Sequence, residues 1–131
     1  MALFPSHAGQ QRGRDGEAIA AAWLRVKGAR IIARNWRPLQ KGLRGEIDII
    51  AQIGEFLCFI EVKTRASDQM GAPQEAVGAA KQKQISRLAN AYLSTHEIGE
   101  VPCRFDVIEV WLSPGQKPRV AWIENAFDFQ G

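Results

Sequence analysis

The sequence of 131 residues contains only two cysteines and two histidines. Cys58 and Cys103 are too few for the disulfide framework of a small secreted domain, and their spacing is not that of a zinc site. We expect both to be reduced thiols in the core. His7 and His96 are far from each other in the sequence and from any second ligand, so we expect no histidine-based metal site.

The sequence also lacks long apolar runs, internal repeats and low-complexity tracts. No run approaches the roughly 20 apolar residues that cross a bilayer, and the first residues do not contain the apolar core of a signal peptide. We therefore expect a cytoplasmic protein without membrane contacts. Hydrophobic residues make up 46% of the chain and charged residues 24%, which is typical of one globular domain.

No large excess of one charge is present, since the formal net charge is +3. A net charge of +3 permits nucleic-acid binding but does not indicate it, so the distribution of the basic residues matters more. They concentrate in the first two-thirds of the chain, which makes one basic face plausible. The candidates for phosphate contacts are Arg12, Arg14, Arg34, Arg37, Lys41, Arg44, Arg65 and Lys81. The alternative is that the charges of loop 37–44 only keep that loop soluble.

Periodicity divides the chain into elements. Residues 1–13 show no pattern and predict a flexible N-terminal arm, and residues 14–131 predict a single domain. Within that domain the pattern predicts helices from Asp15 to Gly28 and from Pro73 to about Ser94. It also predicts strands over 29–36, 104–112 and 120–123, besides the two described next.

Two apolar runs, one over 46–50 and one over 56–63, flank a turn and carry charged residues. Burying an unpaired ion costs several kcal/mol, so these charges need partners. A turn centred on Ile53 and Gly54 places Asp48 opposite Phe59 and diagonal to Glu61 on the same face. Diagonal neighbours lie about 7–8 Å apart, which lets two carboxylates share a cation. A turn of three or five residues would break this arrangement by shifting the parity, unless a β-bulge restored it.

Carboxylates without histidine or cysteine suit Mg²⁺ or Mn²⁺, which commonly assist phosphodiester hydrolysis. Lys63 follows Glu61 on the same face, where it could orient or deprotonate a water molecule and stabilise the phosphate. Glu46 lies on this face too, as a neighbour rather than a ligand. The alternative is structural: Lys63 neutralises Glu61, and Asp48 pairs with Arg44 or Arg65.

Two further acidic residues lie outside the hairpin. Glu17 borders the apolar stripe of the first helix, where it either reaches the metal or a metal-bound water, or is a first-turn glutamate favoured by the helix dipole. Asp106 follows Arg104 at the start of a strand. We expect these two residues to form a structural ion pair rather than a ligand site.

Asp48 together with Glu61-Val62-Lys63 resembles the D…(D/E)xK signature of restriction-endonuclease-like nucleases, with Ile47 in place of the proline of the signature. A longer ordered set of motifs covers residues 12–112 and resembles the YraN-like family of predicted bacterial endonucleases, which is similar to archaeal Holliday junction resolvases. These motifs are Gly16-Glu17, Gly28, Arg34-Asn35-Trp36-Arg37, 45–51, 59–65, Lys81-Gln82 and Arg104-Phe105-Asp106-Val107.

The resemblance implies an α/β fold with an αβββαβ core, a central mixed sheet and flanking helices. It also implies an Mg²⁺- or Mn²⁺-dependent endodeoxyribonuclease with DNA, including branched DNA, as its substrate. Resolution of a junction would require a homodimer, because it needs two symmetric nicks. The implied site is Asp48, Glu61 and Lys63, with the Val62 carbonyl as a further metal ligand, Glu17 in place of the first-helix glutamate of the resolvases, and Gln82 near the phosphate. Gln82 could equally lie on a solvated helix face. The alternative function is a non-catalytic module that binds nucleic acid or a protein through the same fold.

Overall fold

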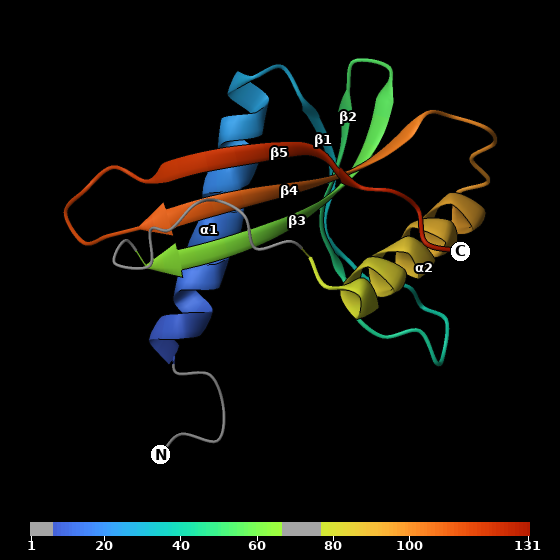
Figure 1. Ribbon diagram of the computed structural model, residues 1–131, viewed down its shortest axis with the longest axis horizontal. Coiled ribbons are helices and arrows are strands. Elements are labelled where there is room, and N and C mark those ends of the chain that lie inside the picture. The colour runs from blue at the N-terminus through green and yellow to red at the C-terminus, as the bar shows by residue number, and fades with distance from the viewer. Residues whose placement is uncertain (1–6, 67–76) are drawn as a thin grey trace.

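The computed structural model describes residues 7–66 and 77–131, with side chains from residue 13 onward. Its elements are α1 (His7–Val26), β1 (Arg30–Trp36), β2 (Ile47–Ile53), β3 (Phe56–Ala66), α2 (Ala79–Thr95), β4 (Cys103–Leu112) and β5 (Arg119–Phe127). The strands form one sheet in the order β1-β2-β3-β4-β5, in which β3 and β4 are parallel and the other neighbours antiparallel (Figure 1). The predicted α/β class is confirmed, and the fold is consistent with a restriction endonuclease-like core.

The sheet separates two hydrophobic cores, each covered by one helix. On one face, Leu24 of α1 packs with Ile49, Ile60 and Ile108. The second core joins α2 to the opposite face and contains Ile50, Phe59, Ile85, Leu88 and Val107. The alternation of side chains along β2 and β3 therefore supplies both cores, which explains why these two strands are apolar on both faces.

The turn between β2 and β3 lies one residue later than predicted. Ile53 pairs with Phe56, so the turn residues are Gly54 and Glu55, and Ile50 rather than Asp48 lies opposite Phe59. Gly54 has φ 59°, a backbone conformation that two-residue hairpins require and glycine adopts without strain. The correction moves the register by two residues. Because two is the period of a strand, Asp48 and Glu61 keep the shared face that is predicted for them.

The regular alternation of β2 changes at Asp48. Ile47 packs in the core beneath α2, whereas Ile49, two residues later, packs in the core beneath α1. In β1, Asn35 lies between the residues paired with Ile49 and Ile47 and has φ 51°, although the register of the pairing is unbroken there. The β2–β3 ladder runs from Ile53–Phe56 to Ile49–Ile60, while β3 stays paired with β4 as far as Ala66. Strands β2 and β3 therefore diverge beside Asp48, and Figure 1 shows them separating.

Element boundaries account for the other corrections. α1 begins at His7 rather than at the predicted Asp15. The prediction misses the first turns because they lack an apolar stripe and contain glycine, and hydrophobic periodicity cannot detect such turns. α2 begins at Ala79, after Gly78 in an extended conformation, rather than at Pro73, which lies outside the described residues. β5 extends to Phe127, beyond the predicted end at 123.

The two cysteines differ in environment. Cys58 is buried, and burial raises the pKa of its thiol to about 12, so this thiol is an inert part of the core. The prediction for Cys103 is wrong in one respect: this thiol is free but exposed. In the described part of the chain, neither helix is long and apolar enough to cross a membrane.

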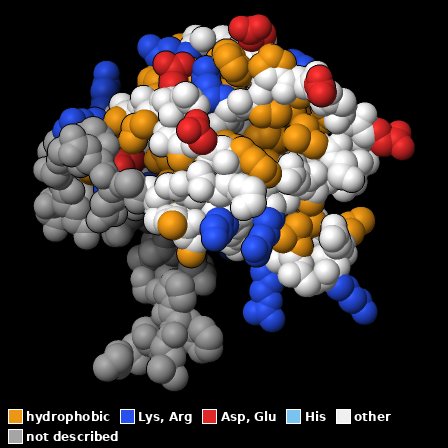
Figure 2. All heavy atoms as spheres, turned by 45° about the vertical axis from the view of Figure 1, so that its right-hand side comes forward, with side chains coloured by type: hydrophobic (Ala, Val, Ile, Leu, Met, Phe, Trp, Pro, Cys, Tyr) orange, Lys and Arg blue, Asp and Glu red, His pale blue; other side chains and the backbone are white. Residues whose placement is uncertain are grey.

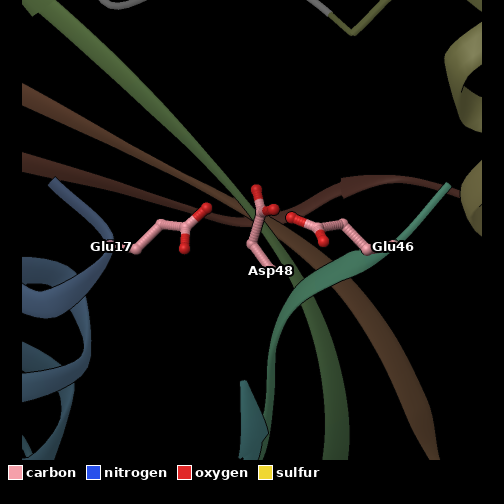
Figure 3. Close-up of side chains that lie close together, drawn as sticks. All are labelled: Glu17, Glu46 and Asp48. Carbon is pink, nitrogen blue, oxygen red and sulfur yellow. The ribbon is translucent and has the colours of Figure 1, made fainter. Parts of the chain in front are cut away.

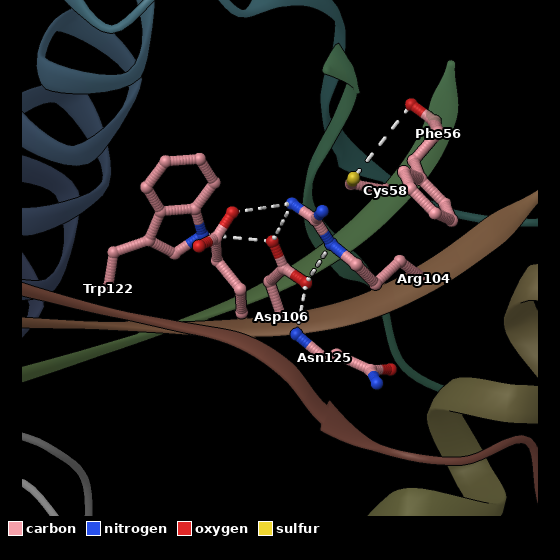
Figure 4. A network of polar contacts seen from close by, with 7 residues as sticks. Phe56, Cys58, Arg104, Asp106, Trp122 and Asn125 are labelled. Atoms are coloured by element: carbon pink, nitrogen blue, oxygen red, sulfur yellow. Dashed lines mark hydrogen bonds and ion pairs between the residues drawn. The ribbon is translucent and has the colours of Figure 1, made fainter. Parts of the chain in front are cut away.

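Asp106 forms the centre of a buried polar network (Figure 4). The carboxylate is 1% exposed and accepts hydrogen bonds from Arg104 Nε and Nη2, Trp122 Nε1 and the Asn125 backbone N–H, each at 2.9 Å. The Arg104 guanidinium also lies over the Phe56 ring, 5.1 Å from its centroid. The predicted Arg104–Asp106 ion pair is confirmed. The hydrogen bonds from Trp122 and Asn125 to the same carboxylate join β4 to β5 at the irregularity between Phe105 and Val107.

Candidate metal centre

Carboxylates from three segments converge where β2 and β3 diverge. Glu17 comes from α1, Glu46 from the residue before β2 and Asp48 from β2 itself, and one oxygen of each lies within 4.8 Å of the others. Figure 3 shows the three side chains pointing toward a common centre. With Glu61 of β3, described below, we refer to these residues as the carboxylate cluster.

Asp48 is the buried member of the cluster, 8% exposed. Its Oδ2 accepts a 2.8 Å hydrogen bond from the Val62 backbone N–H, so a side chain bridges β2 and β3 beyond the last regular rung. Burial, together with the negative charges of Glu61, Glu17 and Glu46, raises the pKa of Asp48 to about 8, although the Val62 bond lowers it. Without a cation, the folded protein therefore favours a protonated Asp48 at neutral pH.

Glu61 lies beside Asp48 and is held by a lysine from α2. Burial raises the pKa of Glu61, and the charge of Lys81, a side-chain hydrogen bond with Asp48 and the charge of Lys63 oppose this rise. The Lys81 Nζ atom is 3.7 Å from Glu61 Oε1. The carboxyls of Asp48 and Glu61 thus face each other, which is the arrangement that a shared cation requires.

Asn35 and Arg37 hold the two outer carboxylates in place. The Asn35 side-chain amide donates to Glu17 Oε2 at 2.7 Å and to Glu46 Oε1 at 3.1 Å. Arg37 Nε and Nη2 each lie 3.0 Å from Glu46 Oε2. The role of Asn35 was not predicted. The signal available was its residue type, because asparagine adopts the left-handed conformation more readily than other non-glycine residues.

Gly16 explains how Glu17 comes close to the sheet. A Cβ atom built on Gly16 would collide with the Thr64 side chain of β3. The absence of a side chain therefore lets α1 lie directly on β3, one residue before the carboxylate that joins the cluster.

We expect Gly16→Ala to destabilise the protein by about 1–3 kcal/mol and to weaken Mn²⁺ binding, because the methyl group pushes α1 and Glu17 away from β3. Thermal unfolding with and without Mn²⁺ measures both effects. Gly13→Ala is the matched control, since its Cβ meets nothing within 4 Å and alanine favours a helix. A Gly16→Ala variant as stable as Gly13→Ala would contradict the close approach.

The other predicted site residues lie in varied surroundings. Gln82 donates its side-chain amide to the Val77 carbonyl at 2.7 Å, and the preceding residue, Lys81, is the one that reaches Glu61. Arg65 lies against the buried Glu109, with Nε 3.7 Å from Oε2. The exposed candidates for phosphate contacts are Arg14, Arg34, Arg37, Lys41 and Arg44. The side chain of Arg12 lies outside the described part of the chain.

The donors of the carboxylate cluster fit a hard divalent cation. They are all oxygens, as Mg²⁺ and Mn²⁺ prefer, and their mutual repulsion favours either protonation or a bound cation. Val62 adds a backbone carbonyl oxygen as a candidate metal ligand. Its N–H points to Asp48, and the C=O of a strand residue faces the same side as its N–H. The arrangement can therefore hold a cation between β2 and β3.

Comparison with known proteins places the chain in one family. Residues 16–110 match the model of a family described as "Uncharacterised protein family UPF0102". A UPF0102 protein of Symbiobacterium thermophilum is 50% identical over 115 residues, which cover 88% of this chain and 94% of the relative. For a UPF0102 protein of Moorella thermoacetica the identity is 47% over 116 residues, covering 88% and 91% of the two chains. The chain therefore belongs to the UPF0102 family.

Proposed function

We propose that the protein is a metal-dependent endonuclease that hydrolyses phosphodiester bonds in DNA. The observation that carries this proposal is the meeting of Asp48 and Glu61 where β2 and β3 diverge. The positive charge of Lys63, two residues after Glu61, lowers the pKa of the Glu61 carboxyl. Two carboxylates and a lysine in this order on neighbouring strands are the residues of the D…(D/E)xK signature.

Each residue then has a role in the hydrolysis. Asp48, Glu61 and the Val62 carbonyl would hold Mg²⁺ or Mn²⁺, and Glu17 would support the cation directly or through water. When bound, the cation lowers the pKa of a coordinated water and neutralises charge on the phosphate. Lys63 orients this water and stabilises the developing negative charge on the phosphate oxygens.

The surface supports a polyanionic substrate. Arg34, Lys41 and Arg44 are exposed in or near the loop between β1 and β2, and Arg14 is exposed on α1. Figure 2 shows several Lys and Arg side chains projecting from the lower edge of the molecule in that view. We propose that Arg14, Arg34, Lys41 and Arg44 contact phosphates and that branched DNA is a substrate. Resolution of a four-way junction would then require a homodimer, because two strands are cut symmetrically.

A second candidate is a non-catalytic module that binds nucleic acid or a protein. It is favoured by the partners that the cluster already has: Arg37 pairs with Glu46, Lys81 pairs with Glu61, and Asn35 donates to Glu17. A network neutralised in this way could stabilise the fold without binding a metal ion. One part of the predicted pairing is present, because the charge of Lys63 lowers the pKa of Glu61. Asp48, for which Arg44 or Arg65 is the predicted partner, accepts a hydrogen bond from the Val62 N–H, and Arg65 lies against Glu109.

The test is cleavage of linear, flapped and four-way DNA in Mg²⁺ or Mn²⁺, compared with a Lys63→Met variant. We expect the wild type to cut at least one of these substrates. We expect Lys63→Met to lower the rate by about 10²–10³-fold, because it removes the ammonium group that orients the water and stabilises the charge on the phosphate. DNA binding, measured in Ca²⁺ by fluorescence anisotropy, is expected to change little.

Lys117→Met is the control, because Lys117 is exposed in the turn between β4 and β5, and this variant is expected to cut at the wild-type rate. A wild-type protein that binds DNA but cuts none of the substrates with either metal would support the binding module instead. Equal cleavage by Lys63→Met and the wild type would remove Lys63 from the site.

A further inference from the structure

Lys81 is the cation that α2 brings to the carboxylate cluster. Its Nζ atom lies 3.7 Å from Glu61 Oε1, and the two side chains are 42% and 15% exposed. The neighbouring polar residues of the helix point elsewhere, since Gln82 donates to the Val77 carbonyl and Lys83 is exposed. The contact is therefore specific to one residue of the helix.

The position of Lys81 is unfavourable for the helix itself. Lys81 is the third residue of α2, and the first turn of this helix contains no acidic residue. A positive charge near a helix N-terminus is opposed by the helix dipole. The helix thus gains nothing electrostatically from a lysine here, whereas the Glu61 carboxylate gains an ion pair with Lys81.

The remaining carboxylates have other partners. Glu46 pairs with Arg37, Glu17 accepts from the uncharged Asn35 amide, and Asp48 accepts from the Val62 N–H. Lys81 consequently acts on the member of the cluster that the proposed cation would share with Asp48. A divalent cation that binds Glu61 must compete with the lysine ammonium for the same carboxylate, and the two positive charges repel each other.

We propose that Lys81 is a positioning residue that fixes Glu61 in the metal-free protein and weakens the affinity of the carboxylate cluster for a divalent cation. The inference rests on the proposed function, because it assumes that the cluster holds a cation. Its distinctive consequence is the sign of the effect. Loss of a merely structural contact would loosen the site and weaken cation binding, whereas loss of a competing charge tightens it.

The experiment measures Mn²⁺ binding to the full chain by the electron paramagnetic resonance signal of free Mn²⁺. The proteins are the wild type, Lys81→Met, Lys81→Gln, Lys81→Arg and the control Lys83→Met. We expect Lys81→Met and Lys81→Gln to bind Mn²⁺ about tenfold more tightly than the wild type, because either change removes the competing charge. We expect Lys81→Arg, which keeps the charge, and Lys83→Met to remain within about twofold of the wild type.

Circular dichroism identifies the variants that fold, and Lys81→Gln provides a second variant should Lys81→Met not fold. Unchanged or weaker Mn²⁺ binding by folded variants that lack the charge would overturn the role of Lys81 while leaving the proposed metal site intact. A wild type that binds no Mn²⁺ would overturn both. A wild type that binds Mn²⁺ but cuts no DNA would count against the nuclease alone.

Discussion

The Asp48→Asn variant is expected to be more stable than the wild type at pH 8 without divalent cations, by roughly 2–4 kcal/mol, and to lose about 10³-fold in DNA cleavage. The two effects have one cause. The carboxylate is buried among other carboxylates, so its charge opposes folding until a cation neutralises it. Asparagine has no such charge, and its Oδ1 can still accept the Val62 hydrogen bond.

The pH dependence follows from the direction of the pKa shift. The pKa of Asp48 is raised from 3.8 to about 8, so between these values the folded state holds a proton that the unfolded state has released. The free energy of unfolding of the wild type therefore falls as pH rises through this window. The advantage of Asp48→Asn is expected to be small near pH 4 and complete above pH 8.

Thermal unfolding of both proteins from pH 4 to pH 9, with and without Mn²⁺, measures this behaviour. Mn²⁺ at about 100 times its dissociation constant is expected to stabilise the wild type by about 2.7 kcal/mol and the variant far less. Glu55→Gln, in the exposed turn, is the control and is expected to match the wild type throughout. An Asp48→Asn variant that is less stable than the wild type at pH 8 would refute the repulsion within the cluster.

The Asp106→Ala variant is expected to lose roughly 3–5 kcal/mol of stability, a large part of the total for a domain of this size. The substitution removes the acceptor of four hydrogen bonds and leaves the Arg104 guanidinium, whose side chain is 13% exposed, without its buried counter-ion. Trp122 Nε1 and the Asn125 N–H lose their acceptor as well.

Urea unfolding followed by tryptophan fluorescence measures this loss. Glu124→Ala is the matched control, because Glu124 also contacts Arg104, at 3.3 Å, but its side chain is 56% exposed. We expect that control to cost less than about 1 kcal/mol, since exposed ion pairs are weak. Equal losses in the two variants would show that burial of the Asp106 network does not determine its contribution.

Part of the site follows directly from strand periodicity. Asp48 and Glu61 were predicted to share a face because side chains alternate along a strand, and the turn at Gly54 and Glu55 kept that parity although it shifted the register by two residues. The elements were predictable for the same reason: each has an apolar stripe of the right period. Residues 7–14 of α1 have none, and this segment was missed.

The sequence offers Glu17 and Glu46 as neighbours of Asp48, but it does not predict how they reach it, because that depends on tertiary packing. Glu17 and Glu46 meet Asp48 only because the alternation of β2 changes at Asp48 and α1 lies close to β3 at Gly16. Neither feature has a periodic signature. Which of the adjacent residues Lys81 and Gln82 reaches the cluster also depends on packing, because adjacent helix residues point about 100° apart and the sequence does not define the rotation of α2.

The acids and the lysine of α2 lie in different halves of the chain. All four carboxylates of the cluster come from residues 17–61, whereas Lys81 follows on α2. During synthesis from the N-terminus, the nascent chain therefore carries the acids before the lysine that contacts Glu61 has been made. The hairpin of β2 and β3 alone does not have the charge balance of the folded site, and that balance is reached only when α2 docks on the completed sheet.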